Sequence, residues 1–257
     1  MLNKKTILNQ LNENDKDDRM LMSLICDRIE ASQLKNYSLF SDFLDSTQQQ
    51  KVKTVFSFME NELLFASKIK NSQNKLVSIN SDFFEIPTKI LELNIPKGYT
   101  VSHSDILGTL MSLGIKRQKI GDIIVSDDGI FIEIKEEISP FVKSNLTSIR
   151  SYPVEINEID DDTIVERVQE YKDLNFTVSS LRLDCVVSSI LNVSREKAKE
   201  YIIAGNVKIN HIEEKNYKKN VSEGNILSLR KSGRYLFFKD DGLSKKGKNK
   251  IIIKKFI

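Results

Sequence analysis

The stretch Ser194–Asn210, SREKAKEYIIAGNVKIN, decides how the C-terminal part of this 257-residue chain folds. Ser194 is a residue type that caps helix N-termini, and apolar residues recur after it at a spacing of four, as on one face of a helix. Gly205 stands where a helix ends in a left-handed backbone. Val207 and Ile209 then alternate with polar residues, as in a strand with one buried face. The stretch predicts a helix, a turn and a strand in succession.

The same stretch concentrates positive charge, in Arg195, Lys197, Lys199 and Lys208. Residues 177–257 hold 18 Lys and Arg against 8 Asp and Glu, a net charge of +10, whereas residues 1–176 hold 21 against 28, a net charge of −7. A basic end on a chain whose overall charge is only +3 is typical of a protein that binds a polyanion. A lysine-rich end that only improves solubility is the alternative.

A further helix is predicted just before this stretch. Apolar residues at i, i+3, i+4, i+7 and i+8 form its buried face: Leu183, Val186, Val187, Ile190 and Leu191. Later runs at 225–230, 234–238 and 251–257 predict short strands. The segment 177–257 is therefore predicted to be two helices packed on a small sheet.

The middle of the chain alternates between element types. Residues 88–96 are typical of a strand, and 102–115 of a helix that stops at Gly114. Two β-rich runs around the turn Asp127–Gly129 predict a hairpin, and a further short helix follows. This order of elements predicts a small α+β sandwich over residues 76–155.

The remaining segments carry little that points to chemistry. Residues 1–75 are predicted to be helical, with Ser46 as an N-cap, and the acidic segment 156–176 is predicted to be a connector. Cys26 and Cys185 lie far apart among apolar neighbours, so we expect neither a disulfide nor a zinc site. No signal peptide or membrane-spanning run is recognised, and a soluble cytoplasmic protein is expected.

The basic residues of the last segment are expected to share one face. Arg182 and Arg195 begin successive helices, and free first-turn amides at the second helix would hold phosphate. Lys208 projects from the outer side of the next strand. Such a face suits the phosphate backbone of folded RNA. On pattern alone, the alternative is a pair of helices whose exposed sides are merely charged.

Two stretches, SSLRLDCVVSSILNVSREKAKEYIIAGNVKIN at 179–210 and VSEGNILSLR at 221–230, resemble the S-four RNA-binding domain, named after a ribosomal small-subunit protein. The family pattern is R-L-D, an apolar helix, S-R-x-x-A, a Gly, V-x-V-N-G and G-D-x-I. This chain departs from the pattern at two turns, with His211 in place of Gly and Asn225 in place of Asp. The resemblance implies RNA contacts from these residues: Ser180, Arg182, Ser194, Arg195, Lys197, Lys199, Lys208 and Asn210.

The stretch at 100–146, TVSHSDILGTLMSLGIKRQKIGDIIVSDDGIFIEIKEEISPFVKSNL, closely resembles the central domain of the YlmH family of bacterial S-four proteins. The family's H-R-D is His103-Ser104-Asp105 here. The resemblance implies an α+β protein with a helical N-terminal domain at 1–75, an RRM-like middle domain at 76–155 and an S-four domain at 177–257.

The same resemblance implies a function on the ribosome. It implies binding to large-subunit rRNA and peptidyl-tRNA in the quality control of stalled nascent chains. The expected partners are RNA and the ribosome. We further expect a monomer that catalyses no reaction and needs neither a cofactor nor a metal.

An RNA-modifying enzyme is the main alternative, since S-four domains also occur on pseudouridine synthases and RNA methyltransferases. Arg182-Leu183-Asp184 offers an aspartate like that of the synthases, but an apolar helix face follows it. Asp184 is therefore interpreted as structural, pairing with a local cation. No phosphate-binding loop supports methyl transfer or NTP hydrolysis. A factor that binds free tRNA is a third alternative.

Two features of the middle segment allow a second interpretation. His103 and Asp105 suggest acid–base chemistry, but Ser104 or Asp105 is more simply the N-cap of the following helix. The basic loop that follows this helix could add RNA contacts or be only solvated, and its cations are Lys116, Arg117 and Lys119.

Overall fold

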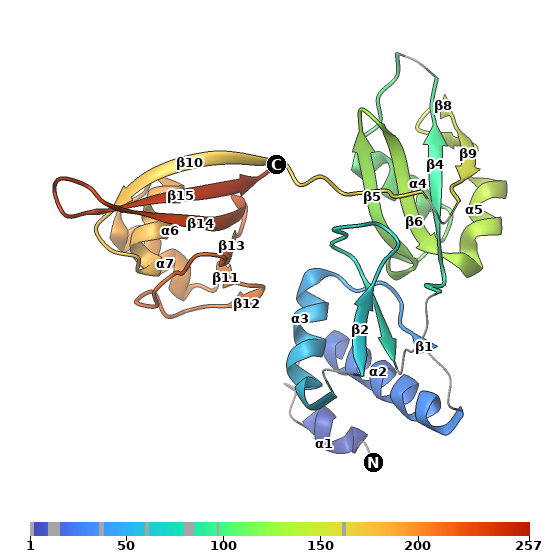
Figure 1. Cartoon of the computed structure of the whole chain (residues 1–257), viewed down its shortest axis with the longest axis horizontal. Coiled ribbons are helices and arrows are strands. Elements are labelled where there is room, and N and C mark those ends of the chain that lie inside the picture. Colours follow the sequence, from blue (N-terminus) through green and yellow to red (C-terminus); the bar gives the residue numbers. More distant parts are fainter. Residues whose placement is uncertain are drawn as a thin grey trace. The chain divides into compact units, whose positions relative to one another are not determined.

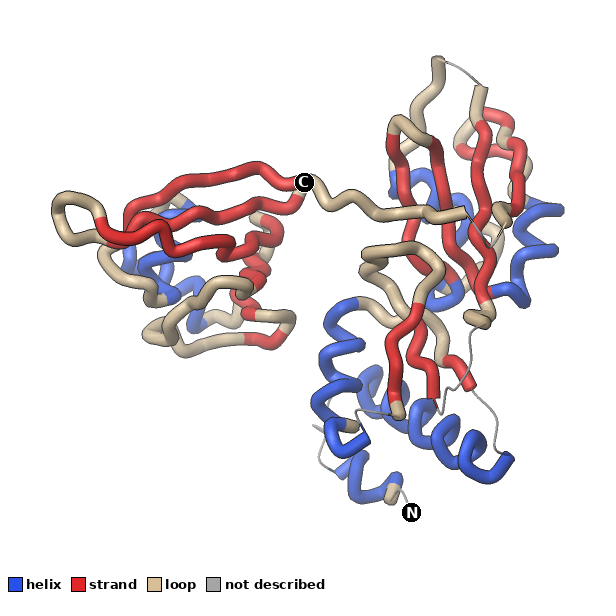
Figure 2. The backbone as a smooth tube through the Cα atoms, viewed as in Figure 1, coloured by secondary structure: helices blue, strands red, loops and turns tan. Residues whose placement is uncertain are grey.

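The computed structural model divides into two compact units, Met1–Arg167 and Val168–Ile257, here called unit 1 and unit 2. Each unit combines helices with antiparallel sheets, so the predicted α+β class is confirmed (Figure 1 and Figure 2). The structure describes residues 3–9, 16–35, 39–59, 62–79, 85–96, 98–160 and 163–257.

The N-terminal part of unit 1 contains helices and a small sheet. Its helical elements are α1 (Lys4–Asn9), α2 (Lys16–Lys35), α3 (Ser46–Val55) and the 3-10 turn η1 (Ser57–Met59). Its strands, in the spatial order β1-β3-β2, are β1 (Leu39–Phe40), β2 (Leu63–Ala66) and β3 (Leu76–Ile79). The helices agree with the prediction for residues 1–75, whereas the sheet departs from it, because strands of two to four residues show no periodicity.

The cap of α3 corrects one prediction. Its N-cap is Asp45 and not Ser46. The Asp45 side chain accepts a hydrogen bond from Gln48 N at 2.8 Å, and the Gln48 side chain accepts one from Asp45 N at 3.0 Å. This capping box needs Glu or Gln three residues after the cap, and the position of Gln48 selects Asp45.

The middle part of unit 1 has the element order β-α-β-β-α-β, which is that of a ferredoxin-like sandwich. Its sheet has the spatial order β5-β6-β4-β9, with each neighbouring pair antiparallel. The larger elements are β4 (Thr88–Asn94), α4 (His103–Ser112), β5 (Ile120–Ser126), β6 (Gly129–Lys135), α5 (Ser139–Asn145) and β9 (Glu155–Glu158). The short ones are η2 (Arg117–Lys119), η3 (Glu136–Ile138), β7 (Ser148–Ile149) and β8 (Tyr152–Pro153). The predicted strand, helix, hairpin and short helix are all confirmed.

One face of this sheet packs on α4 and α5. Alternate residues of the strands, such as Leu91 and Ile132, join Ile106 and Leu110 of α4 in one buried cluster. Gly114 follows α4 with a φ of +85°, the left-handed backbone that the sequence predicts.

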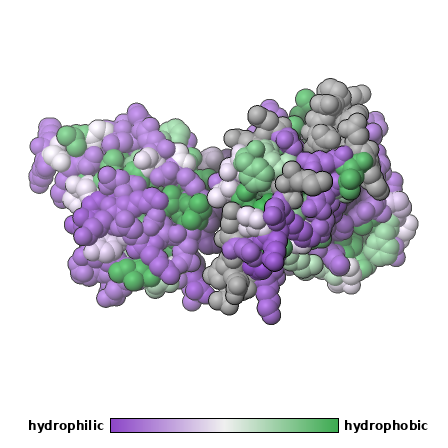
Figure 3. All heavy atoms as spheres, turned by 90° about the horizontal axis from the view of Figure 1, so that it is seen from below, coloured by the Kyte–Doolittle hydropathy of each residue, from purple (hydrophilic) through white to green (hydrophobic). Residues whose placement is uncertain are grey.

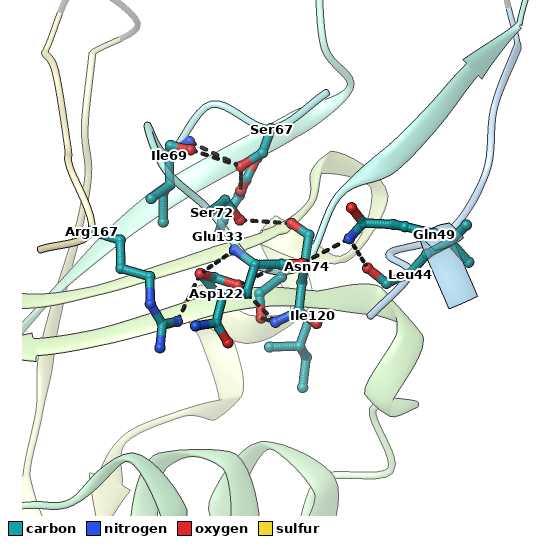
Figure 4. Close-up of polar contacts among 12 residues, drawn as sticks. Leu44, Gln49, Ser67, Ile69, Ser72, Asn74, Ile120, Asp122, Glu133 and Arg167 are labelled. Atoms are coloured by element: carbon teal, nitrogen blue, oxygen red, sulfur yellow. Dashed lines mark hydrogen bonds and ion pairs between the residues drawn. The ribbon is translucent and has the colours of Figure 1, made fainter. Parts of the chain in front are cut away.

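The other face of the sheet is covered by the chain itself. Asp122 and Glu133 point to this side and are both almost fully buried. Asp122 accepts hydrogen bonds from the backbone N–H of Gln73 at 2.9 Å and of Asn74 at 2.8 Å. It also accepts one from Arg167 Nη1 at 2.8 Å (Figure 4). The carboxylate therefore holds two distant chain segments on the sheet.

Glu133 holds the neighbouring part of the covering segment. It accepts hydrogen bonds from the Ser67 hydroxyl, from Lys68 N at 2.8 Å and from Thr88 Oγ1 at 2.9 Å. Beside these polar contacts, Ile69 packs with Ile90, Val165 and Phe131 in a small apolar cluster. The helix-free face of the middle sheet is therefore an internal interface of unit 1.

The predicted connector 156–176 is divided between the two units. Its first residues belong to β9, which pairs with β4. Residues 165–167 lie along Lys70, whose N–H donates to Val165 O at 2.9 Å and whose carbonyl accepts from Arg167 N at 2.9 Å. Its last residues begin a strand of unit 2, and its residues 161–162 lie outside the described residues. Most of the described part is therefore not a free linker.

Unit 2 is a six-stranded antiparallel sheet with two helices. The sheet order is β10-β15-β14-β13-β11-β12. The predicted elements are confirmed as α6 (Leu183–Leu191), α7 (Arg195–Ile203), β11 (Val207–Ile209), β13 (Ile226–Leu229), β14 (Gly233–Leu243) and β15 (Asn249–Phe256). Two further strands are not predicted: β10 (Tyr171–Val178), although its Leu174, Phe176 and Val178 alternate with polar residues, and the two-residue β12 (Ile212–Glu213).

The helices of unit 2 cover one face of its sheet. Val186 of α6 and Ile202 of α7 are buried with inward residues of the strands, among them Val207, Phe237 and Ile253. The remaining strand residues alternate to the opposite face. Unit 2 therefore has a helix-covered face and an outer sheet face.

Candidate nucleic-acid interface

A buried carboxylate lies at the centre of the predicted basic face of unit 2. Asp184, in the first turn of α6, is 0% exposed. Arg182, the N-cap residue of α6, donates from Nε to Asp184 Oδ1 at 3.2 Å and from Nη2 to Oδ2 at 3.0 Å. Arg195, the first residue of α7, donates from Nη2 to Oδ2 at 2.8 Å. One carboxylate therefore binds the arginines that begin two successive helices, and the interpretation of Asp184 as a structural partner of local cations is confirmed.

Both arginine side chains also reach solvent. The side chain of Arg182 is 32% exposed and that of Arg195 is 48% exposed. Burial alone would raise the pKa of Asp184, but the hydrogen bonds and charges of Arg195 and Arg182 outweigh it and lower that pKa. The hydrogen bond to Asp184 in turn raises the pKa of Arg195. The cluster keeps two cations against one anion at neutral pH, and each guanidinium keeps further N–H donors that can bind phosphate.

The segment 214–220 packs on the start of α6. The N–H of Leu183 donates to Lys219 O at 2.8 Å, and the N–H of Asp184 donates to Tyr217 O at 3.1 Å. These α6 amides are therefore already paired with the chain and do not offer a phosphate site.

The start of α7 differs from that of α6. Ser194 Oγ, the predicted N-cap, accepts a hydrogen bond from Lys197 N at 3.3 Å. Among the described residues, the N–H groups of Arg195 and Glu196 have no such partner. The expectation of open amides therefore holds for the first residues of α7.

An aromatic ring that sequence reasoning missed completes this face. The Tyr217 ring centroid lies 5.9 Å from Arg182 Cζ, 5.6 Å from Lys199 Nζ and 5.8 Å from Lys218 Nζ. Tyr217 lies in a loop without periodicity, and its only sequence signal is its position among lysines. The face formed by Arg182, Arg195, Lys199, Tyr217 and Lys218 is called the arginine face below.

Two other predicted RNA contacts take part in local structure. The Ser180 hydroxyl lies 3.3 Å from Cys185 Sγ. Asn210 Oδ1 accepts a hydrogen bond from Ile226 N at 2.8 Å, and Asn210 and His211 both have a positive φ. The left-handed backbone at His211 explains why the family pattern prefers Gly there. The side chains of Ser180 and Asn210 therefore hold local turns in place.

The lysines predicted to bind RNA do not all share one face. Lys197 is exposed on α7, and Lys199 pairs with Glu196 at 2.7 Å. Lys208 lies between Val207 and Ile209, which are buried on the helix side, so its side chain is on the outer sheet face. The alternation of the strand therefore separates Lys208 from the arginines, against the expectation of one common face. The visible surface of unit 2 is largely hydrophilic (Figure 3).

The basic loop of unit 1 is mostly bound within its own unit. Lys119 Nζ forms ion pairs with Asp42 at 2.6 Å and with Glu137 at 2.7 Å. Arg117 is half-buried and donates to Ile120 O, and burial lowers its pKa. Lys116 is exposed. Of the three predicted additional contacts, Lys116 presents its side chain most openly.

His103 and Asp105 form no acid–base pair in the structure. Ser102, and not Ser104 or Asp105, is the N-cap of α4, and Asp105 occupies the third helical position of its capping box. Asp105 Oδ1 also accepts a hydrogen bond from Arg150 Nε at 2.8 Å. The structural interpretation of Asp105 is thus confirmed, with the cap itself two or three residues earlier than predicted.

The described ranges contain neither a cluster suited to a metal ion nor a helix suited to a membrane span. No group of three or more His, Cys, Asp and Glu side chains there is arranged to hold a metal ion. No helix in those ranges combines the length and apolar character that a membrane span requires. Cys26 and Cys185 are both buried and free.

Comparison with known families gives two matches. A model described as "Putative RNA-binding domain in YlmH" matches residues 80–163, and a model described as "S4 domain" matches residues 181–227. The first match spans the middle sheet of unit 1, and the second spans both helices of unit 2.

Individual proteins are also similar to this chain. "Ribosome-associated protein quality control protein P2" of Bacillus subtilis (strain 168) is 31% identical over 216 residues, which cover 81% of this chain and 83% of that protein. The solved structure "Cell division protein ylmH from Streptococcus pneumoniae" matches with a TM-score of 0.46 and 21% identity, over 58% of this chain and 95% of that one.

Proposed function

This chain belongs to the YlmH family of S-four-domain RNA-binding proteins, and from that premise we propose that it acts on the ribosome. It binds large-subunit rRNA and peptidyl-tRNA and takes part in the quality control of stalled nascent chains. It acts as a cytoplasmic monomer. The printed name of the Bacillus subtilis relative, which describes ribosome-associated quality control, supports this proposal.

The observation that carries the proposal is the arginine pair bound to Asp184. A buried carboxylate fixes the guanidinium groups of Arg182 and Arg195, and both side chains are still partly exposed to solvent. Fixed guanidinium groups lose less conformational entropy when they bind phosphate, and they hold it through a planar fork. The geometry suits the backbone of folded RNA, which proteins recognise by shape and charge.

The same carboxylate supports a function without catalysis. A catalytic aspartate must reach the reacting atoms, whereas Asp184 is fully buried and both its oxygens accept from arginines. Ribosomal RNA from cells with and without the protein should therefore show identical nucleosides by mass mapping. A protein-dependent modified nucleoside that disappears in an Asp184→Ala strain would favour a pseudouridine synthase-like enzyme.

Co-sedimentation with large ribosomal subunits tests the proposal. Arg195→Ala should weaken association by roughly 1–3 kcal/mol, because a charge-assisted contact is lost. The matched control is Arg150→Ala, which removes another helix-proximal Arg–Asp pair, in unit 1, and should leave association unchanged. Thermal melts confirm that both variants fold. A folded Arg195→Ala protein that sediments with subunits as well as wild type would contradict the proposal.

A further inference from the structure

The outer sheet face of unit 2 carries aromatic rings among cations. Ile251 and Ile253 of β15 point into the core. Side chains alternate along a strand, so Ile252, Lys254 and Phe256 point to the outer face. In β10, Tyr171 lies directly opposite Phe256.

One row of this face crosses five strands. The pairing register places Lys208 of β11 opposite Ser228 of β13, and Ser228 opposite Arg234 of β14. Arg234 Cζ lies 4.8 Å from the Phe256 ring centroid. The Phe256 and Tyr171 rings meet edge to face, with centroids 5.1 Å apart. The row therefore runs from cations to aromatic rings.

Phe238, at a bulge in β14, adds a third ring to the face. Phe237 pairs with Ile253 and Lys239 pairs with Ile252, so Phe238 between them is the extra residue. Phe237 is buried, whereas Phe238 is 46% exposed, and its ring centroid lies 3.9 Å from Lys254 Nζ. Alternation after Phe237 turns the Phe238 ring outward, and the bulge places Lys239 on the same face, opposite Ile252.

Charge on this face favours a polyanion. Lys208, Arg234, Lys250 and Lys254 lie on it, with Asp173 opposite Lys254 and Glu213 opposite Lys208 in the register. Lys254 Nζ is also 5.6 Å from the ring centroid of Tyr171, which is 38% exposed. Cations therefore stand beside each outward ring.

We propose that this outer sheet face binds single-stranded RNA, with bases stacked on Tyr171, Phe238 and Phe256 and phosphates held by Arg234 and Lys254. Rings interleaved with cations are the arrangement on which unpaired bases stack while the backbone follows the positive charge. The inference rests on the proposed RNA-binding function but uses a surface distinct from the arginine face. These five residues all lie outside the two segments that family models match, 80–163 and 181–227.

Two labelled RNAs test the proposal against the full chain: an unstructured strand of about 12 nucleotides and a stable hairpin. Phe238→Ala and Tyr171→Ala should each weaken binding of the single strand about tenfold and change hairpin binding less than about twofold. Tyr171→Phe, which keeps the ring, should bind the single strand like wild type. Phe58→Ala removes an exposed ring of unit 1 and is the matched control.

Arg195→Ala separates this proposal from the proposed function. It should weaken hairpin binding and spare the single strand. Folded Phe238→Ala and Tyr171→Ala proteins that bind the single strand like wild type would overturn the outer-face proposal alone. That proposal also fails if these variants instead abolish self-association in sedimentation velocity, because the face would then join two copies of the chain. If the wild-type protein binds neither RNA, the proposed function is overturned as well.

Discussion

The two main sheets of this protein differ in what their helix-free faces present. In unit 1 the helix-free face is covered by residues 67–74 and 165–167, and its acidic side chains Asp122 and Glu133 are buried beneath them. In unit 2 the corresponding face is open and carries Tyr171 and Phe238 among cations. RRM domains bind RNA by stacking bases on sheet aromatics, a mode that needs an open sheet face. The β-α-β-β-α-β element order of unit 1 is therefore not enough to locate an RNA site.

The buried carboxylates Asp122 of unit 1 and Asp184 of unit 2 differ in a related way. Asp122 accepts from two backbone N–H groups as well as from the side chains of Asn74 and Arg167, so it fixes the path of the chain. Asp184 accepts only from arginine side chains, so it fixes cations at a surface. The partners of a buried acid thus distinguish a structural interface from a surface prepared for an anion.

A substitution beneath the covered face of unit 1 should have the largest effect on the free energy of unfolding. Asp122→Asn removes the charge that pairs with Arg167 and places an amide against the N–H groups of Gln73 and Asn74. We expect a loss of about 3 kcal/mol in the free energy of unfolding of unit 1, as for removal of one partner of a buried ion pair. Urea unfolding followed by circular dichroism measures it. Asp128→Asn, the same change at an exposed turn, should lose almost nothing, and an equal loss in both variants would contradict the role given to Asp122.

The equivalent change in unit 2 should have a smaller effect on stability and a clear effect on binding. Asp184→Asn should lower the free energy of unfolding by about 2 kcal/mol, because the freed arginines can turn to solvent. Hairpin RNA binding should weaken as the guanidinium groups lose their fixed positions. Fluorescence anisotropy at matched folded concentration tests this. Unchanged hairpin affinity in a folded Asp184→Asn protein would show that the carboxylate does not orient the arginines.

Glu133→Gln should have the smallest effect on the free energy of unfolding. The pH dependence that Glu133 gives to stability should be opposite to that from Asp122. Burial raises the pKa of Glu133 above its usual 4.5. Burial also acts to raise the pKa of Asp122, but hydrogen bonds from Gln73, Asn74 and Arg167 outweigh it and lower that pKa. A raised pKa of an acid gives stability that is present below the unfolded value and is lost as pH rises through the folded value. Wild-type unit 1 should therefore lose stability through Glu133 as pH rises above about 4.5 toward neutral.

The Gln variant should remove this pH-dependent loss. An amide can accept from Lys68 N and Thr88 Oγ1 and donate to Ser67, so the change at neutral pH should stay within about 1 kcal/mol. Urea midpoints measured from pH 5 to 8 (roughly the range in which many proteins are most stable) provide the comparison. A Gln variant whose midpoints follow the same pH slope as wild type would contradict the assignment.

Local patterns in the sequence predict the elements that depend on nearby residues. The apolar spacing of α6, the Ser194 cap, the turn at Gly205 and the hairpin of β5 and β6 all follow from residues a few positions apart. The pairing of β10 with β15 joins Tyr171 to Phe256, and no local pattern in the acidic segment indicates it. Long-range strand pairing depends on the whole sheet, and propensity alone does not determine it.

The candidate site is predictable in the same uneven way. The motif implies Arg182 and Arg195, and the interpretation of Asp184 as a partner of local cations is correct. The outward direction of Lys208 follows from strand alternation and is confirmed, but the position of the arginines on the other side of the sheet and the ring of Tyr217 depend on tertiary packing. A fragment intended to carry the whole of unit 2 should accordingly begin at residue 168, since residues 171–178 pair with β15.

The salt dependence of hairpin RNA binding tests the central claim most directly. Each phosphate that a cation neutralises releases counterions, so the logarithm of the affinity falls linearly with the logarithm of the salt concentration. If Arg195 holds a phosphate from its position beside Asp184, wild type should show a steep slope and Arg195→Ala a slope smaller by about 1. A flat response in wild type, or an unchanged slope in a folded Arg195→Ala protein, would contradict phosphate binding by the arginine face.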